Sequence, residues 1–142
     1  MATKKSKQPV SFRFERGTVR HLKRRAAEVG APQAALAERY IEEGLRMDEH
    51  PLIYFREGAA GRRPRLLGTR LDVATVVETI RQHDNSIEDA AEYLDVPVGH
   101  VQECLRYYVE HEREIDEWIK QERSAAERER DLWTRQQDAL VE

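Results

Sequence analysis

The stretch of residues 68–111 constrains the fold most, because three helical patterns follow one another there with only short breaks between them. Apolar residues recur at the i, i+3, i+4 and i+7 spacing that lines one face of a helix. The predicted inward-facing sets, in chain order, are Val73, Val76, Val77 and Ile80, then Ile87, Ala90, Ala91 and Leu94, then Val101, Leu105 and Tyr108. These sets predict three short helices around a shared core.

Local signals separate the three helices. Ser86 is a suitable N-cap for the second helix, and Asp89 three residues later is typical of a capping box. Asp95-Val96-Pro97 is expected to end that helix, and proline suits the first turn of the next one. The pattern predicts a helix-turn-helix, whose third helix conventionally enters a DNA groove.

The formal net charge of −3 hides a gradient along the chain. Residues 1–47 hold 11 Lys and Arg against 5 Glu, a net +6, and residues 48–67 hold 4 against 3, a net +1. Residues 68–111 hold 3 Arg against 9 acids, a net −6, and residues 112–142 hold 6 cations against 10 acids, a net −4. Because phosphate neutralisation drives DNA binding, the basic first third is the expected DNA-binding part.

The acidic helix-turn-helix is therefore expected to bind protein or to build a dimer, since like charges would repel DNA. Gln102 and Arg106 on its third helix are the alternative base contacts.

The basic first third has the predicted order strand, helix, helix. Residues 10–15 alternate apolar and polar side chains with the period of two of a half-buried strand. Two helical patterns follow, over residues 19–29 with Gly30 as a C-cap, and over residues 36–45. A lone strand exposes both edges, and the simplest partner is the same strand of a second chain. We therefore expect a homodimer.

With these elements, residues 9–47 resemble the ribbon-helix-helix family of bacterial repressors. The resemblance implies that paired strands enter the major groove, with Ser11 and Arg13 facing the bases and Phe12 and Phe14 packed beneath. The family's hydroxyl residue at the start of the second helix is absent from Gly30-Ala31-Pro32-Gln33, so phosphate contacts are expected from other cations. These cations are Lys4, Lys5, Lys7, Arg16, Arg20, Lys23, Arg24 and Arg25. The alternative is an edge strand beside a solvated helix face.

A linker and a β-hairpin are predicted next. Asp48-Glu49-His50-Pro51 is expected to end the preceding helix and to act as the linker. Residues 52–55 are predicted to form one strand and residues 62–67 a second, antiparallel strand, with a glycine-containing turn between them. Arginines 62, 63 and 65 leave two interpretations open, contact with nucleic acid or ion pairs with the acidic helices that follow.

Residues 50–108 look like the domain of unknown function 433 family, a homeodomain-like module of bacterial VapB-like antitoxins. The resemblance rests on the strand after His50-Pro51, on Gly61-Arg62-Arg63 and on Gly68-Thr69-Arg70-Leu71. It implies the antitoxin half of a type II toxin-antitoxin system, with a PIN-like ribonuclease toxin as the partner.

Residues 112–142 are expected to form a helical tail that binds this partner. Ile115 and Ile119 continue the apolar spacing of the third helix, so that helix is predicted to run past His111 with a heptad-like seam against a second copy or the chain's own core. Large apolar side chains in so polar a context favour burial in a partner. The predicted toxin-binding residues are Trp118, Ile119, Arg128, Leu132 and Trp133. The alternative is a solvated helix with charged pairs at i, i+4.

Neither catalysis nor a cofactor is expected. The five histidines lie on different predicted elements without metal-ligand spacing, so no metal site is predicted. Cys104 is the one cysteine, which fits a reducing cytosol, and its position favours a small core residue. No apolar run reaches the length of a membrane span, so we expect a cytoplasmic protein.

The sequence thus predicts a mainly α chain with a small β part. Its predicted segments are a basic arm over residues 1–8, a ribbon-helix-helix domain over 9–47, a hairpin plus helix-turn-helix over 48–111 and a helical tail over 112–142. The expected function is a homodimeric or larger antitoxin that represses its own operon at operator DNA and neutralises a PIN-like toxin. A stand-alone dimeric transcriptional regulator without a toxin is the alternative.

Overall fold

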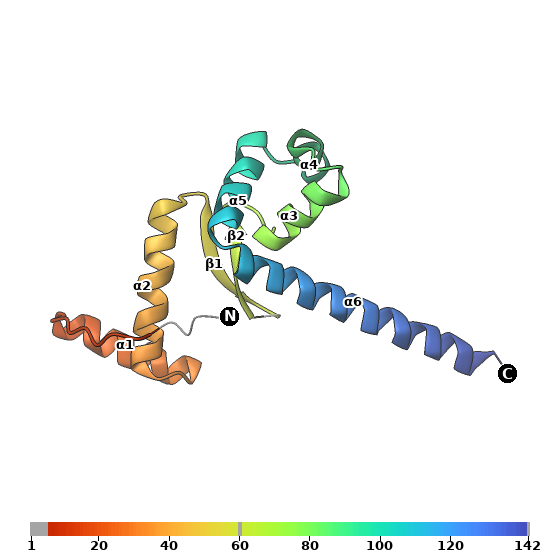
Figure 1. Ribbon diagram of the computed structural model, residues 1–142. Coiled ribbons are helices and arrows are strands. Elements are labelled where there is room, and N and C mark those ends of the chain that lie inside the picture. The colour runs from red at the N-terminus through yellow and green to blue at the C-terminus, as the bar shows by residue number, and fades with distance from the viewer. Residues whose placement is uncertain (1–5, 60, 142) are drawn as a thin grey trace. The chain divides into compact units, whose positions relative to one another are not determined.

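The computed structural model describes residues 6–59 and 61–141, and within them it contains six helices and one two-stranded antiparallel sheet (Figure 1). The predicted mainly α architecture with a small β part is therefore confirmed. The chain divides into two compact units, Met1–Glu42 and Glu43–Glu142. None of the described helices combines the length and apolar character that a bilayer-spanning segment needs.

The first unit consists of helix α1, Arg16–Val29, and the first part of helix α2, Gln33–Glu49. Gly30 ends α1 as predicted, in the left-handed conformation with φ of 66° that glycine adopts without strain. Residues 10–15 form no hydrogen-bonded strand within the single chain. This agrees with the physical argument that one strand needs a partner, but the paired ribbon itself stays a prediction.

The second unit begins inside α2, so the prediction of a linker between domains at residues 48–51 is wrong. Helix α2 ends at Glu49, before Pro51, but the side chain of His50 is fully buried in the second unit. Strands β1, Ile53–Gly58, and β2, Gly61–Leu66, then form the predicted hairpin, with Ile53 opposite Leu66. The chain around His50 is therefore packed against this unit instead of spanning solvent.

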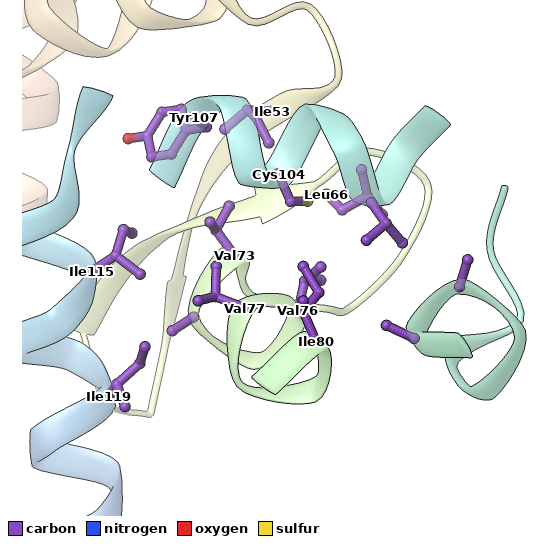
Figure 2. Close-up of a cluster of buried hydrophobic side chains, with 14 residues drawn as sticks. Ile53, Leu66, Val73, Val76, Val77, Ile80, Cys104, Tyr107, Ile115 and Ile119 are labelled. Carbon is purple, nitrogen blue, oxygen red and sulfur yellow. The ribbon is translucent and has the colours of Figure 1, made fainter. Parts of the chain in front are cut away.

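Three helices follow as predicted: α3, Val73–Gln82, α4, Ile87–Leu94, and α5, Val98–Glu110. The Oγ of Ser86 accepts a hydrogen bond from the backbone N–H of Asp89 at 3.1 Å, which confirms the N-cap of α4. All four inward-facing residues predicted for α3 are buried. Figure 2 shows the core, where Ile53 and Leu66 of the hairpin meet side chains of α3, α5 and α6.

The inward face of α5 differs from the predicted one by about one position. Val101, Cys104 and Tyr107 are fully buried, whereas Leu105 and Tyr108 are only partly buried against the core. Both sets fit a helical spacing of three to four residues, so periodicity alone could not choose between them. The prediction that Cys104 is a small core residue is confirmed.

Helix α6, Glu112–Leu140, is not a continuation of α5. His111 adopts φ of −134° and ψ of 36°, which breaks the helical path between the two helices. Ile115 and Ile119 are buried, so the seam predicted for this region packs on the chain's own core. Residues 123–141 are all exposed, and Figure 1 shows the second half of α6 extending beyond the rest of its unit.

Candidate nucleic-acid and partner-binding surfaces

The residues predicted to contact DNA are accessible wherever the structure describes them. Ser11 and Arg13 are exposed in the segment before α1, and Arg16 and Arg20 are exposed one turn apart on α1. The Nζ of Lys7 lies 3.3 Å from a carboxylate oxygen of Glu38 in an exposed ion pair, which is weak and does not prevent DNA contact. Lys4 and Lys5 lie outside the described residues.

An apolar groove of about 450 Å³ runs across the first unit. Its lining residues come from the segment before α1 and from both helices: Phe14, Thr18, Val19, His21, Leu22, Arg25, Ala37, Tyr40 and Ile41. Phe12 and Phe14, predicted to pack beneath a strand, are 63% and 53% exposed in the single chain. The expected packing is therefore not formed, because no described residue of the single chain covers these two rings enough to bury them.

The first unit also carries a strong positive charge and has little interior of its own. Met1–Glu42 holds 10 Lys and Arg against 4 Glu, a net charge of +6, whereas Glu43–Glu142 holds 14 against 23 acids, a net charge of −9. Among the described residues up to Glu42, the buried ones are Ala26 and Leu36. An unfilled apolar face on a basic unit suits association with both a second protein surface and a polyanion.

The arginines of the hairpin are used inside the second unit. Arg62 forms a bidentate ion pair with Glu43 at 2.6 Å, and Arg65 pairs with Asp72 at 3.0 Å. Arg63 is buried, pairs with Asp72 and Glu122, and lies over the ring of Trp118 at 4.4 Å. Of the two interpretations left open by the sequence, the structure supports ion pairing with carboxylates of the same unit.

The arginine on the outer face of α5 is already engaged within the second unit. Arg106 donates hydrogen bonds to Glu103 at 2.6 Å and to the backbone carbonyl of Glu49 at 2.8 Å. Gln102 is exposed and next to the acid Glu103. Arg106 would have to leave both acceptors to reach a base, so the alternative base contact on α5 loses support.

The five residues predicted to bind a partner through α6 separate into two groups. Ile119 is only 4% exposed, so its assignment as a partner contact is wrong, whereas Trp118 packs against the core but is only partly buried, and its role in partner binding stays a prediction. Arg128, Leu132 and Trp133 are exposed, with Trp133 at 63%. The spacing seen in the sequence could not tell where the core ends along α6.

An apolar stripe continues along α6 beyond the core. Ile119, Ala126, Trp133 and Leu140 follow one another at intervals of seven residues, which keeps them on nearly one face of a helix. A groove between α3 and α6 is lined by Ile119 and Ala126 together with charged side chains such as Glu78 and Arg130. The stripe thus begins in this groove and continues to the exposed end of α6.

The structure also brings together a polar group that the sequence did not reveal. The rings of His50 and His111 lie with centroids 6.2 Å apart, and His50 Nε2 is 2.7 Å from an oxygen of Glu110. Glu103, 3.2 Å from His50 Nδ1, has its pKa lowered chiefly by the hydrogen bond from Arg106, whereas burial lowers the pKa of His111. His50 and His111 do lie on different elements, as predicted, but the fold brings them together with Glu110, and residues 61 apart in the sequence show no spacing signal.

Comparison with known proteins finds no matching family model, no similar curated protein and no similar solved structure. The two family resemblances seen in the sequence therefore stay predictions.

Proposed function

We propose that this chain is a dimeric, DNA-binding antitoxin that represses its own operon and neutralises a PIN-like ribonuclease toxin. In this proposal the first unit pairs with a second copy and binds operator DNA. The second unit is a folded support for α6, and the exposed end of α6 binds the toxin.

The observation that carries the proposal is the open apolar groove of the basic first unit. A groove that exposes Phe14, Leu22 and Ile41 to water is unfavourable, because each such side chain gains roughly 1.5–3 kcal/mol when it is fully buried. A second copy would cover this face with the same residues and would give residues 10–15 the strand partner that they lack.

Pairing of residues 10–15 would also orient the DNA contacts. Side chains alternate between the two faces of a strand, so Phe12 and Phe14 would share one face and Ser11 and Arg13 the other. With the aromatic face on the groove, Arg13 would point outward from a unit of net charge +6. An arginine presented in this way can donate two hydrogen bonds to guanine in the major groove.

The toxin-binding part of the proposal rests on the exposed half of α6. Leu132, Trp133 and Leu140 are exposed large apolar side chains, and tryptophan is enriched among residues that dominate binding energies. An amphipathic helix can lay such a face into a hydrophobic groove of its partner. Arg128 would approach the carboxylates that hold metal in a PIN-like active site.

Fluorescence anisotropy with the DNA upstream of the gene tests the DNA-binding part. Arg13→Ala is expected to weaken binding to the operator more than binding to unrelated DNA, because loss of a base contact costs about 1–3 kcal/mol. Arg56→Ala is the matched control, since Arg56 is an exposed arginine of the acidic unit. Equal affinities of the two variants would contradict the assignment of Arg13.

A stand-alone regulator without a toxin is the second candidate. It is favoured by exposed Tyr93 and Val109 on the acidic unit, which could serve a different protein contact. Co-expression with the products of neighbouring genes distinguishes the two. Failure of every neighbouring product to copurify through α6 would favour the regulator.

A further inference from the structure

We infer that the second unit contains a zinc-binding site formed by His50, Glu110 and His111. The three residues come from two parts of the fold: His50 follows the end of α2, whereas Glu110 and His111 are neighbours at the junction of α5 and α6. Metal binding would therefore tie the base of α6 to the end of α2. The inference does not depend on the proposed function.

The positions of the ligand atoms carry the inference. Each of the three residues offers one ligand atom, and these atoms lie within 4.8 Å of one another. A tetrahedral zinc ion with bonds of about 2.0–2.2 Å holds its ligand atoms roughly 3.4 Å apart. The 2.7 Å contact between His50 Nε2 and Glu110 would open slightly, and the ring of His111 would approach. Two imidazoles and one carboxylate are a common zinc ligand set that leaves a fourth position open.

The carboxylate of Glu103 orients His50 in the way that is common for histidines that bind a metal ion. His50 Nδ1 lies 3.2 Å from Glu103, and Arg106 holds Glu103 with hydrogen bonds of 2.6 and 3.0 Å. A histidine that binds metal usually donates its other ring N–H to such a carboxylate, which fixes the tautomer. With the proton on Nδ1, the lone pair of Nε2 faces Glu110, at the place where the ion would enter.

Burial supports the same site. The side chain of His50 is fully buried and lies between two carboxylates, so an ion bound at its Nε2 would offset their negative charge. The Nε2 of His111 is also buried and has no hydrogen-bond partner among the described residues. Buried polar atoms are rarely left without a partner, so this nitrogen points to a missing ligand.

The surrounding charges permit a divalent ion. Burial lowers the pKa of His111 most and the charge of Arg46 lowers it further, but Arg46 is itself paired with Glu114 at 2.7 Å and hydrogen-bonded to the hydroxyl of Tyr107. Arg106 is likewise paired with Glu103. Glu110 contributes a carboxylate oxygen that already lies beside His50 and could bind the ion there.

Cobalt substitution tests the site in the full chain. The protein, free of any histidine tag and stripped with a chelator, is titrated with Co²⁺ and followed by visible absorption. We expect the intense bands of four-coordinate cobalt at one ion per chain, and their loss when Zn²⁺ displaces the cobalt. Thermal melting should give a higher Tm with Zn²⁺ than without it, because an ion that binds the folded state stabilises it.

Variants assign the ligands. Glu110→Gln and His111→Gln each remove a proposed ligand and are expected to weaken Zn²⁺ binding by more than about tenfold. Glu103→Gln is expected to weaken Zn²⁺ binding by about 10–100-fold but to keep the four-coordinate cobalt spectrum, because Glu103 only positions His50. Glu117→Gln and His100→Gln are the matched controls outside the cluster and should bind as the wild type does. Two ligand variants are used so that one that fails to fold still leaves a test.

Three outcomes would overturn the inference. The first is a weak, six-coordinate cobalt spectrum. The second is a folded Glu110→Gln or His111→Gln variant with wild-type affinity. The third is a nitrogen NMR spectrum in which both ring nitrogens of His50 stay protonated in excess Zn²⁺, which would identify a buried imidazolium between Glu103 and Glu110 instead.

Discussion

The two units of this chain differ in how much of their apolar surface they bury. The acidic second unit has a complete interior, in which the hairpin, three short helices and the first turns of α6 share one apolar cluster. The basic first unit buries little and leaves an apolar groove open. A short segment with two helices cannot enclose a core, so its stability depends on what covers the groove. The second unit can therefore act as a folded scaffold by itself, whereas the first unit is proposed to be completed by an interface.

The largest expected effect concerns the scaffold core. Tyr107→Ala removes a fully buried aromatic ring and is expected to lower the free energy of unfolding by about 3–5 kcal/mol, because a cavity remains. Tyr93→Ala is the matched control and is expected to change it by less than about 0.5 kcal/mol, since Tyr93 is 70% exposed. Urea denaturation measures both. Similar losses for the two variants would mean that the core is assigned incorrectly.

The two tryptophans of α6 test where the scaffold ends. Trp118→Ala should destabilise the second unit by about 2 kcal/mol, because the ring packs on the core and beneath Arg63. Trp133→Ala should leave stability unchanged but weaken toxin binding by about 2 kcal/mol or more, as expected of an interface anchor.

Calorimetry with the partner and thermal melting of the free protein separate these two effects. A Trp133→Ala variant that melts early, or a Trp118→Ala variant that melts normally, would reverse the proposed division of α6. The fold of each variant is checked by circular dichroism before binding is compared.

The open groove predicts concentration-dependent association. Ile41→Asp places a charge in the groove and should raise the dissociation constant of the dimer by more than about tenfold, or about 1.4 kcal/mol. Val109→Asp introduces the same charge at an exposed site of the second unit and should leave the dimer intact. Sedimentation equilibrium provides the measurement. A wild-type monomer at every concentration would contradict the interface role of the first unit.

The effect expected to be smallest at neutral pH comes from the buried thiol of Cys104, which is then protonated in both the folded and the unfolded state. Burial raises the pKa of Cys104 from 9.0 to about 12, so the folded state keeps its proton after the unfolded state has lost it. Stability is then fully present below pH 9 and falls as the pH rises from about 9 toward 12, by at most about 1.4 kcal/mol per pH unit. Cys104→Ala should reduce this alkaline slope in urea titrations. An equal slope in both proteins would show that other groups cause it.

Much of the local structure could be predicted from the sequence, because helix periodicity and end signals act between neighbouring residues. The four apolar residues of α3, the Ser86 cap and the Gly30 stop all have the predicted roles. The face of α5 was harder to predict, since Cys104 and Tyr107 fit the helical spacing as well as Leu105 and Tyr108 do. Where two faces have similar apolar content, only the neighbouring elements decide which one is buried.

The candidate site was less predictable, because it depends on residues far apart in the chain. The exposed positions of Ser11, Arg13, Leu132 and Trp133 agree with sequence expectations, but their roles in binding stay predictions. Trp118 and Ile119 carry the same apolar signal as Trp133, and composition cannot distinguish a core contact from a partner contact. Whether such a residue contacts the core or a partner depends on whether another element of the unit packs against its turn of α6.

The sequence by itself determined most of the helices, the hairpin and the charge difference between the two ends of the chain, since each of these depends on neighbouring residues or on simple counting, but it did not predict the break at His111. Only the tertiary structure decided that the hairpin arginines pair with Glu43, Asp72 and Glu122, and that His50 meets Glu110 and His111. The physical reason is that ion pairs and ligand sets act over a few ångströms in space, whatever the separation of their residues along the chain.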